Sequence, residues 1–574
     1  MSSQYDHGID HGLHHLTNEM ADSRKAAQAC MTCRRQKRRC DKAFPQCSLC
    51  RRMNRQCDYS DPAAHPTSDD FNTLKDEVAN LRQILQGGSL PGNPIMISSP
   101  GALSGPEAIA REAQNYAAAP QQDNSWQGAQ NRFPAFAFLD KDAFKTGGIT
   151  VPKPNIEIPS HVLDIMGDGT SVQEALDVYF ATVHVWMPII SRKRLEAYMA
   201  SPTWNWGPDT AFLFLCIKLI CLRPQDGLEV SQNHIYVSAK RVLSLLEATG
   251  TVSLLVLQAA LLIVWYEYGQ AIYPAAYMTA GWCKRYGILL DINNHPSAYE
   301  MLGRPETWTE QEERRRTWWG VLISDRVVKI GSQGHILNSQ EPKEDAYLPS
   351  NDTIWDEGDI AKLVQHTTSP DGIEVLGPFA RLCQGYMMLG RVYKHRHGEA
   401  YTSEHEANAA AILLYDDSAA LATSILDEAR SSPDNLTLAT PVALIFSTLY
   451  ALCDSYNNPG VTSDDAAAKV QTRALDGLDF VSLSVVDFAK TVDSAAPEAQ
   501  DLDRVSPLVM DCLYQTASHH AWRLRESGDQ NSQMALDSIR HSLQRLAGRW
   551  RNAAEYLRFL EAQELCHYAV QAGV

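Results

Sequence analysis

Six cysteines between residues 30 and 57 could bind metal. They repeat one spacing, C-x2-C-x6-C, in two copies that are six residues apart: Cys30, Cys33, Cys40, Cys47, Cys50 and Cys57. A C-x2-C pair places two thiolates within reach of one ion, and an even number of soft sulfur ligands suits tetrahedral zinc. Four cysteines would complete one structural site, and six can complete two sites only if two thiolates bridge the ions. The spacing therefore predicts structural zinc, in one closed site or in two sites that share sulfur.

The same segment is strongly basic. Nine Lys or Arg residues and a single acid, Asp41, give residues 30–57 a formal charge of +8, while the whole chain carries −17 and the remainder therefore −25. Six thiolates and two zinc ions together add −2, so a metal-loaded segment stays near +6. A basic segment on an acidic protein predicts a surface that binds the phosphates of nucleic acid. The net acidity elsewhere keeps the rest of the protein away from nucleic acid.

These residues resemble the fungal Zn2Cys6 binuclear cluster transcription factors. The resemblance covers the six cysteines, the basic run at residues 34–39, Pro45 two residues before the fourth cysteine, and the exit Cys57-Asp58-Tyr59. It implies two zinc ions per chain, bridged by the first and fourth cysteines, which here are Cys30 and Cys47. A fully coordinated cluster of this kind has no open position for water and is structural, not catalytic.

The resemblance also implies a mode of DNA binding. In the family a short helix begins at the second cysteine and enters the major groove of double-stranded DNA, where a lysine four positions on reads a CGG triplet. That position is Lys37, and lysine can donate to guanine O6 and N7. Gln36 stands where the family often has a second lysine, so contacts that need that lysine are in doubt, although glutamine can hydrogen-bond base edges. The expected phosphate contacts, which position the protein without reading sequence, are Arg34, Arg35, Arg38 and Arg39.

Three other interpretations of the segment were weighed. A disulfide framework would suit a secreted protein, but residues 1–29 are polar and rich in histidine, with no apolar stretch typical of a signal peptide. An iron–sulfur site would use a different spacing and would leave the arginines unexplained. The basic run could act only as a nuclear localisation signal, and we expect it to serve that purpose as well.

Composition and periodicity predict how this segment is joined to the rest of the chain. We expect a disordered tail at 1–29, the zinc module at 30–57, a linker at 58–70, a coiled coil at 71–85, a disordered linker rich in Gly, Pro, Ser and Gln at 86–150, and a helical domain at 151–574. The apolar seam of the coiled coil alternates spacings of three and four. A helix this short needs a partner: another copy of the chain, as the resemblance implies, or the chain's own helical domain. The seam residues are Phe71, Leu74, Val78, Leu81 and Leu85.

Helical periodicity dominates after residue 151, and the predicted fold class is mostly α. Ser171 and Glu174 predict a capping box at the start of a helix. Residues 312–329 and 346–358 resemble the regulatory domain that follows the zinc cluster in many fungal factors, so the all-helical domain is expected to modulate activation. The arginines at 314–316 are interpreted as packed against acids, and His395 and His397 as surface residues. The apolar run at 254–266 is shorter than a membrane span and predicts a core helix.

Together these features predict a nuclear, homodimeric, sequence-specific transcription factor. We expect it to bind double-stranded DNA at CGG-type triplets, to contact the transcription machinery, and to activate RNA polymerase II genes of a fungal secondary-metabolite cluster. The alternative is an interaction or corepressor protein whose cluster has only non-specific DNA affinity. An enzyme is disfavoured because G-x-S-x-G, Walker, G-x-G-x-x-G and H-E-x-x-H motifs are absent from the sequence. No interaction with membranes is expected.

Overall fold

The structure is a computed structural model of the 574-residue chain, which divides into two units, Met1–Ser104 and Gly105–Val574. The residues described are 26, 29–35, 38–59, 133–140, 142, 144, 151, 156–200, 207–225, 227, 229–292, 301–331, 341–343, 345–368, 376–397, 401–457 and 465–572. Gln36 and Lys37 lie outside them. The predicted coiled coil at 71–85 also lies outside them, with its seam residues Phe71, Leu74, Val78, Leu81 and Leu85.

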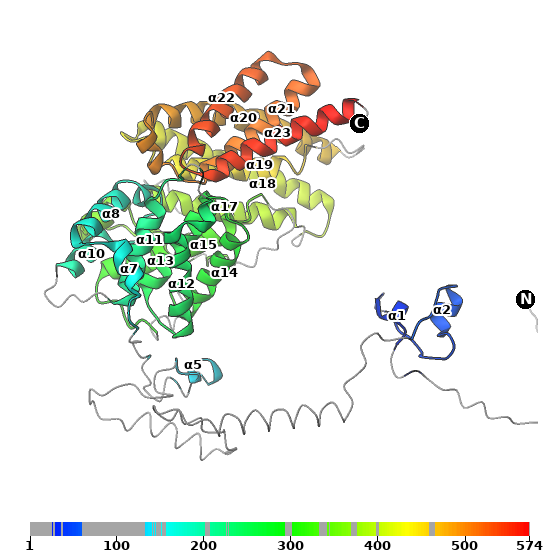
Figure 1. The fold of residues 1–574 in the computed structure, drawn as a ribbon. Coiled ribbons are helices and arrows are strands. Elements are labelled where there is room, and N and C mark those ends of the chain that lie inside the picture. The colour runs from blue at the N-terminus through cyan, green and yellow to red at the C-terminus, as the bar shows by residue number, and fades with distance from the viewer. Residues whose placement is uncertain are drawn as a thin grey trace, which may run out of the picture. The chain divides into compact units, whose positions relative to one another are not determined.

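Each unit is built from helices (Figure 1). The described residues of the first unit form two short ones, α1 (Met31–Arg35) and α2 (Ser48–Arg52). The earlier helices of the second unit are α5 (Phe136–Leu139), α7 (Ser160–Met166), α8 (Gly169–Ala181), α9 (Val183–Trp186), α10 (Arg192–Met199), α11 (Pro208–Cys221), η2 (Val230–Gln232), α12 (His234–Ala248), α13 (Leu254–Gly269), α14 (Ala275–Leu289) and α15 (Trp308–Val327). The later ones are α16 (Asp352–Glu357), η3 (Ile360–Lys362), α17 (Pro378–Arg396), α18 (Glu404–Ser431), α19 (Ala439–Cys453), α20 (Asp465–Ala495), η4 (Ala499–Arg504), α21 (Val509–Ser527), α22 (Gln530–Ala547) and α23 (Arg551–Ala572).

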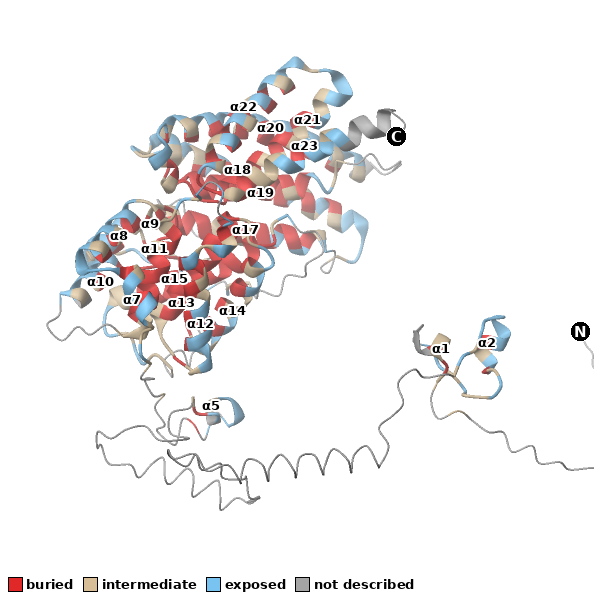
Figure 2. Cartoon of the chain, in the orientation of Figure 1, coloured by how far each residue is buried: buried red, intermediate tan, exposed pale blue. Residues whose placement is uncertain are grey.

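Helix α13 lies at the centre of the earlier group. Every residue from Val256 to Gly269 is buried, and the helix packs against α11, α14 and α15. Figure 2 shows the buried residues concentrated where helices of the second unit face one another. The prediction of a core helix at 254–266 is confirmed. The bridge whose two partners both lie within the described residues is an isolated one, Tyr347 with Thr367, and the elements described are helices, so the mostly α fold class is confirmed as well.

Short polar side chains fix where many of these helices begin. The hydroxyl of Ser253 accepts from the Leu255 N–H at the start of α13, and that of Thr307 accepts from the Glu310 N–H at the start of α15. Such caps satisfy N–H groups that have no partner inside the helix. Helix α8 corrects the predicted capping box, because its N-cap is Asp168, whose carboxylate accepts from the Ser171 N–H at 2.9 Å. Ser171 is therefore inside the helix and does not cap it.

Two further expectations change. The linker predicted to extend to residue 150 contains the short helix α5, which belongs to the second unit. His395, interpreted as a surface residue, is only 4 % exposed, because its ring nitrogens lie 2.8 Å and 2.5 Å from the hydroxyls of Tyr401 and Tyr456.

One described helix, α18, is long and apolar enough to cross a membrane by length and composition. It packs against α17, α19 and α20, and its acids pair with arginines of two of these neighbours. Arg391 of α17 lies 2.7 Å from Asp417, and Arg473 of α20 pairs with Asp416. In this body α18 therefore serves as a bundle helix.

Helix α15 carries a buried ionic network. Arg316 is fully buried, with Nε 3.0 Å from Glu312, Nη1 2.6 Å from Asp352, and Nη2 donating to the Ser350 carbonyl at 2.7 Å. Its guanidinium also lies 4.1 Å from the centre of the Trp355 ring. Arg314 and Arg315 pair with Glu310 and Glu312. The interpretation of residues 314–316 as packed against acids is confirmed.

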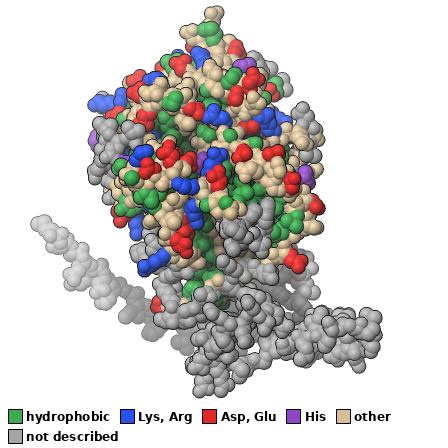
Figure 3. All heavy atoms as spheres, turned by 90° about the vertical axis from the view of Figure 1, so that its left-hand side faces the viewer, with side chains coloured by type: hydrophobic (Ala, Val, Ile, Leu, Met, Phe, Trp, Pro, Cys, Tyr) green, Lys and Arg blue, Asp and Glu red, His purple; other side chains and the backbone are tan. Residues whose placement is uncertain are grey.

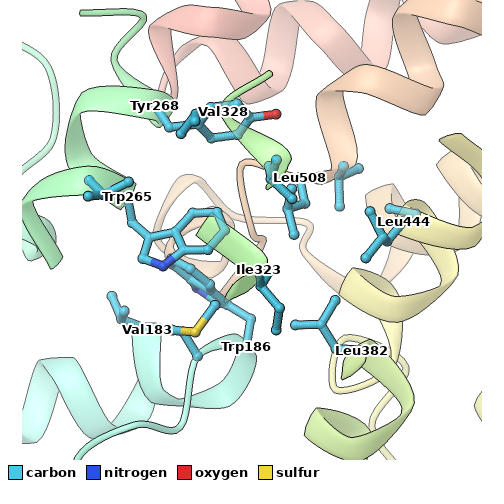
Figure 4. Packing of buried hydrophobic residues seen from close by; sticks show 14 of the residues in the cluster. Val183, Trp186, Trp265, Tyr268, Ile323, Val328, Leu382, Leu444 and Leu508 are labelled. Atoms are coloured by element: carbon cyan, nitrogen blue, oxygen red, sulfur yellow. The ribbon is translucent and has the colours of Figure 1, made fainter. Parts of the chain in front are cut away.

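The junction between α22 and α23 joins the later helices to the earlier ones. Arg549 donates to the carbonyls of Ile220 and Leu222 at the end of α11, and the indole N–H of Trp550 donates to the Val505 carbonyl. A Cβ at Gly269 would lie 2.3 Å from the Trp550 ring, so only glycine permits this contact. Figure 4 shows the adjoining core, where Trp186, Trp265, Ile323, Leu382, Leu444 and Leu508 come together from distant parts of the sequence.

Replacing Arg316 with methionine should destabilise the helical body by about 3–5 kcal/mol, because Glu312 and Asp352 would then lose their shared partner in a buried environment. The matched control is Arg430→Met, which removes an ion pair with Asp427 whose arginine side chain is 73 % exposed; such pairs contribute about 0–1 kcal/mol. Urea unfolding of the full chain, followed by helical circular dichroism, measures both. Equal stability of the two variants would contradict the structural role of Arg316.

Candidate zinc cluster and nucleic-acid interface

Four thiols of the first unit have the spacing of a zinc site. The sulfur of Cys30 lies 3.9 Å from that of Cys47 and 3.7 Å from that of Cys50, and the sulfur of Cys33 lies 3.7 Å and 3.9 Å from the same two. A tetrahedron of sulfurs, each about 2.3 Å from a central zinc, has edges of about 3.8 Å. All four residues are buried. The donor set and its size therefore fit one zinc ion.

The other two cysteines adjoin the same group. The sulfurs of Cys40 and Cys47 lie within 4.8 Å of each other, and the Cys47 N–H donates to the Cys57 sulfur at 3.3 Å. Burial acts to raise the pKa of Cys57, but hydrogen bonds that include the thiols of Cys30 and Cys47 outweigh it and lower the pKa, so these thiols lie near Cys57. Cys30 and Cys47 thus belong both to the first group of four and to the surroundings of Cys40 and Cys57. This is the arrangement that a pair of ions sharing two sulfurs requires.

Two helix starts position the C-x2-C pairs. The Cys30 sulfur accepts from the Cys33 N–H, and the Cys47 sulfur accepts from the Cys50 N–H, both at 3.4 Å. The first cysteine of each pair therefore acts as a helix cap, and one turn of helix brings the second cysteine to the same side. The resemblance implied a helix that begins at the second cysteine. Instead α1 begins at Met31, because the Cys30 sulfur already satisfies a free N–H of the first turn.

Two residues outside the cysteine pattern hold the connecting loops. The Tyr59 hydroxyl donates to the Ala43 carbonyl at 3.0 Å and lies 3.9 Å from the Cys40 sulfur, and the Tyr59 ring packs on Phe44 at 4.8 Å. Asp41 accepts from the backbone N–H of Ser48 at 3.0 Å and from its hydroxyl. These roles were missed from sequence. The Cys57-Asp58-Tyr59 exit was noted there only as part of a resemblance, and Asp41 only as a charge.

The protonation of these thiols depends on a cation. Burial raises the pKa of Cys33 well above its usual range and that of Cys50 to about 12. Burial would also raise the pKa of Cys40, but hydrogen bonds from the backbone of Cys30 and Lys42 outweigh it and lower the pKa to about 7. Several thiolates within 4 Å would repel one another, so zinc must supply the positive charge that replaces their protons.

The predicted DNA contacts are only partly within the described residues. Arg38 and Arg39 are exposed, as are Arg51 and Arg52 of α2. Arg34 and Arg35 lie in α1, of which only the backbone is described at these two positions, while Gln36 and Lys37 lie outside the described residues. The exposed arginines surround a module whose interior consists of sulfur, so their charge faces solvent, where phosphate could reach it.

Comparison with known proteins is consistent with this geometry. Residues 28–65 match the fungal Zn(2)-Cys(6) binuclear cluster domain, and residues 176–373 match the fungal specific transcription factor domain. Transcription factor BOA15 of Botryotinia fuckeliana is 35 % identical over 182 residues, which cover 97 % of that protein and 31 % of this chain. The chain belongs to the fungal Zn2Cys6 transcription factors. Proteins with this cluster bind two zinc ions, and this chain is a sequence-specific DNA-binding transcription factor.

Two longer matches each cover 66 % of this Zn2Cys6 factor. The pigment biosynthesis transcriptional activator pigB of Monascus ruber is 26 % identical over 408 residues, 66 % of this chain and 67 % of that protein. The azaphilone cluster-specific transcription factor azaR of Aspergillus niger is 23 % identical over 392 residues, 66 % of this chain and 74 % of that protein.

Substituting one of the two shared sulfurs should remove more than one ion. We expect the purified full chain to contain two zinc ions and the Cys47→Ser variant to retain fewer than one, because both sulfur groups include Cys47. Cys221→Ser is the control, since Cys221 lies at the end of a helix in the second unit. Elemental analysis measures zinc per chain. Two ions retained in Cys47→Ser would contradict the shared position of this sulfur.

Proposed function

We propose that Cys30, Cys33, Cys47 and Cys50 hold one zinc ion and that Cys30, Cys40, Cys47 and Cys57 hold the second. The observation that carries the proposal is the tetrahedral spacing of the first four sulfurs, with Cys30 and Cys47 also beside the remaining two. Zinc supplies the charge that keeps the thiolates ionised and close. The cysteines, in turn, fix the two helix starts from which the basic residues extend.

This module is the sequence-specific DNA-binding domain. Lys37 reads a CGG-type triplet in the major groove, with Gln36 beside it, because a lysine at this point can donate to both acceptors of guanine. Arg34, Arg35, Arg38 and Arg39 contact phosphates and set the orientation. The exposure of Arg38 and Arg39 supports that role. The acidic remainder of the chain favours binding through the module alone, since it repels the DNA backbone.

The factor acts in the nucleus as a homodimer and as an activator of RNA polymerase II genes. The apolar seam at 71–85 pairs two chains, and the linker at 58–70 sets the separation of the two triplets. Its targets are the genes of a fungal secondary-metabolite cluster. The names of the similar proteins, a pigment biosynthesis transcriptional activator and an azaphilone cluster-specific transcription factor, support this assignment. The helical body transmits regulation and carries no catalytic step, in agreement with its match to a transcription-factor domain.

Base reading and phosphate binding can be separated by two substitutions in the full chain. Lys37→Ala should abolish preference for a CGG-containing duplex over random duplex, at a cost of about 1–3 kcal/mol on the specific site. Arg39→Ala should weaken all duplexes alike and reduce the dependence of affinity on salt. Competition binding at several salt concentrations measures both effects. Equal losses on every sequence for both variants would instead favour a corepressor or interaction protein with non-specific DNA affinity.

Dimerisation has its own test. Leu81→Asp should make the chain monomeric, because it places a charge in the apolar seam where two helices would meet. Affinity for a duplex with two triplets should fall, while affinity for a duplex with one triplet should stay unchanged. Sedimentation together with duplex binding checks this. A Leu81→Asp chain that remains dimeric would show that the seam packs elsewhere, for example on its own helical domain.

A further inference from the structure

The second unit contains a cavity of about 1100 Å³ between helix α14 and the segment at residues 133–144. Ligand sites for organic molecules usually measure about 300–1,000 Å³ and are lined by aromatic side chains with a few polar groups. Neither zinc binding nor DNA binding involves this cavity, which is formed wholly by residues of the second unit.

One wall of the cavity is aromatic and held in place. The rings of Trp282 and Tyr286 stack with centroids 4.5 Å apart and planes 16° apart. The Tyr286 hydroxyl donates to the Thr251 carbonyl at 2.6 Å and accepts from the Ser253 N–H at 3.1 Å. These hydrogen bonds hold the Tyr286 ring, on which Trp282 stacks. A flat molecule that stacks on this wall would therefore not have to immobilise the two rings first.

The floor of the cavity is formed by a glycine that packing does not explain. Helix α14 contains Gly281 and Gly287. A Cβ at Gly287 would lie 3.0 Å from the Trp318 ring, so that glycine allows α14 and α15 to approach closely. A Cβ at Gly281 would meet no atom of the described residues within 4 Å. Glycine inside a helix costs about 1 kcal/mol relative to alanine. At Gly281 the missing side chain exposes the helix backbone to the cavity, where a flat ring could lie.

The cover of the cavity is apolar and only partly buried. Phe144 is 5 % exposed, and Phe133 lies so close to Gly250 that a Cβ there would be 2.8 Å from the Phe133 Cβ. Between these anchored positions Phe138 lines the cavity while remaining 73 % exposed. An aromatic side chain left exposed beside a cavity gains free energy when an apolar ligand covers it.

The charges of the lining balance one another. Three basic residues, Lys284, Arg285 and Lys329, face three acids, Glu247, Asp291 and Asp325. The ammonium groups of Lys284 and Lys329 lie 3.5 Å and 3.6 Å from the carboxylate of Asp325. An ionised ligand would therefore meet a charge of its own sign as readily as an opposite one, whereas a neutral ligand would leave these pairs intact.

We propose that this cavity binds one neutral, flat, conjugated ring molecule, which lies over Gly281 and stacks against Trp282. The site gives the helical body a small-molecule ligand and is independent of the zinc module. It goes beyond the proposed DNA-binding function, and either one can fail without the other.

The test uses the zinc-loaded full chain and two fluorescent probes. N-phenyl-1-naphthylamine is neutral, while 8-anilino-1-naphthalenesulfonate has the same rings and a negative charge. We expect one N-phenyl-1-naphthylamine per chain and clearly weaker binding of the sulfonate. Gly281→Leu should weaken binding of the neutral probe at least about tenfold, because its side chain enters the cavity, and Gly281→Ala should weaken it less. The fold should tolerate both changes, since each residue favours helix more than glycine does.

Gly169→Leu is the matched control, because a Cβ at Gly169, another helical glycine, would likewise meet no described atom within 4 Å. Gly169 lies in α8, outside the cavity. Its probe binding should equal that of the unmodified chain. Undiminished binding by Gly281→Leu, or an equal loss in Gly169→Leu, would overturn the site. Sulfonate binding as tight as that of the neutral probe would overturn the chemical class. Binding of a CGG duplex by the same samples reports separately on the proposed DNA-binding function.

Discussion

The close approach of six thiols in a short basic segment is the constraint on which this protein's function depends. Among the described residues of the zinc module, the buried hydrophobic cluster consists of four cysteines. Cys40, Cys57, Leu49 and Tyr59 are partly buried beside them. A segment of this length cannot bury enough apolar surface to fold alone. Bound zinc thus stabilises this module as a hydrophobic core stabilises larger domains. The free energy of zinc binding contributes directly to the free energy of folding. Arg38, Arg39, Arg51 and Arg52 are exposed, so their charge faces solvent while sulfur fills the interior.

The helical body uses arginine in the opposite way. Arg316, Arg326 and Arg549 are all fully buried, and each joins elements that are distant in sequence. Arg326, for example, donates to the Tyr386 carbonyl and pairs with Glu341, both at 2.6 Å. Figure 3 shows acidic and basic side chains interspersed over the visible face of this body. Acids nevertheless outnumber bases outside the zinc module, where the chain carries −25, and this net negative charge agrees with leaving nucleic-acid binding to the cysteine module.

The body also extends beyond the part that the family domain covers. The match ends at residue 373, yet Arg549 bonds the end of α11, and Trp550 packs on Gly269 of α13. Helices α17 to α23 are therefore part of the same folded body as the matched region. A ligand held beside α14 would contact the helix that packs on both α13 and α15. These two helices lead to Trp550 and to the arginine network, so the cavity adjoins the contacts that join the two halves.

The sequence by itself determined the chemistry that is local along the chain. Cysteine spacing predicts the sulfur cluster, because two residues between ligands on one turn of helix already fix the separation of the sulfurs. The 3.6-residue periodicity predicts most helices, because each helix must bury an apolar face. Only the tertiary structure decided what depends on distant partners. Basic runs at 34–39 and 314–316 look alike in sequence, but the second is buried because Asp352 and Trp355 lie across from it. His395 is buried by Tyr456, and Phe133 and Phe144 line the cavity beside α14. In each case the partner is distant in sequence, and local residue spacing cannot predict such a contact.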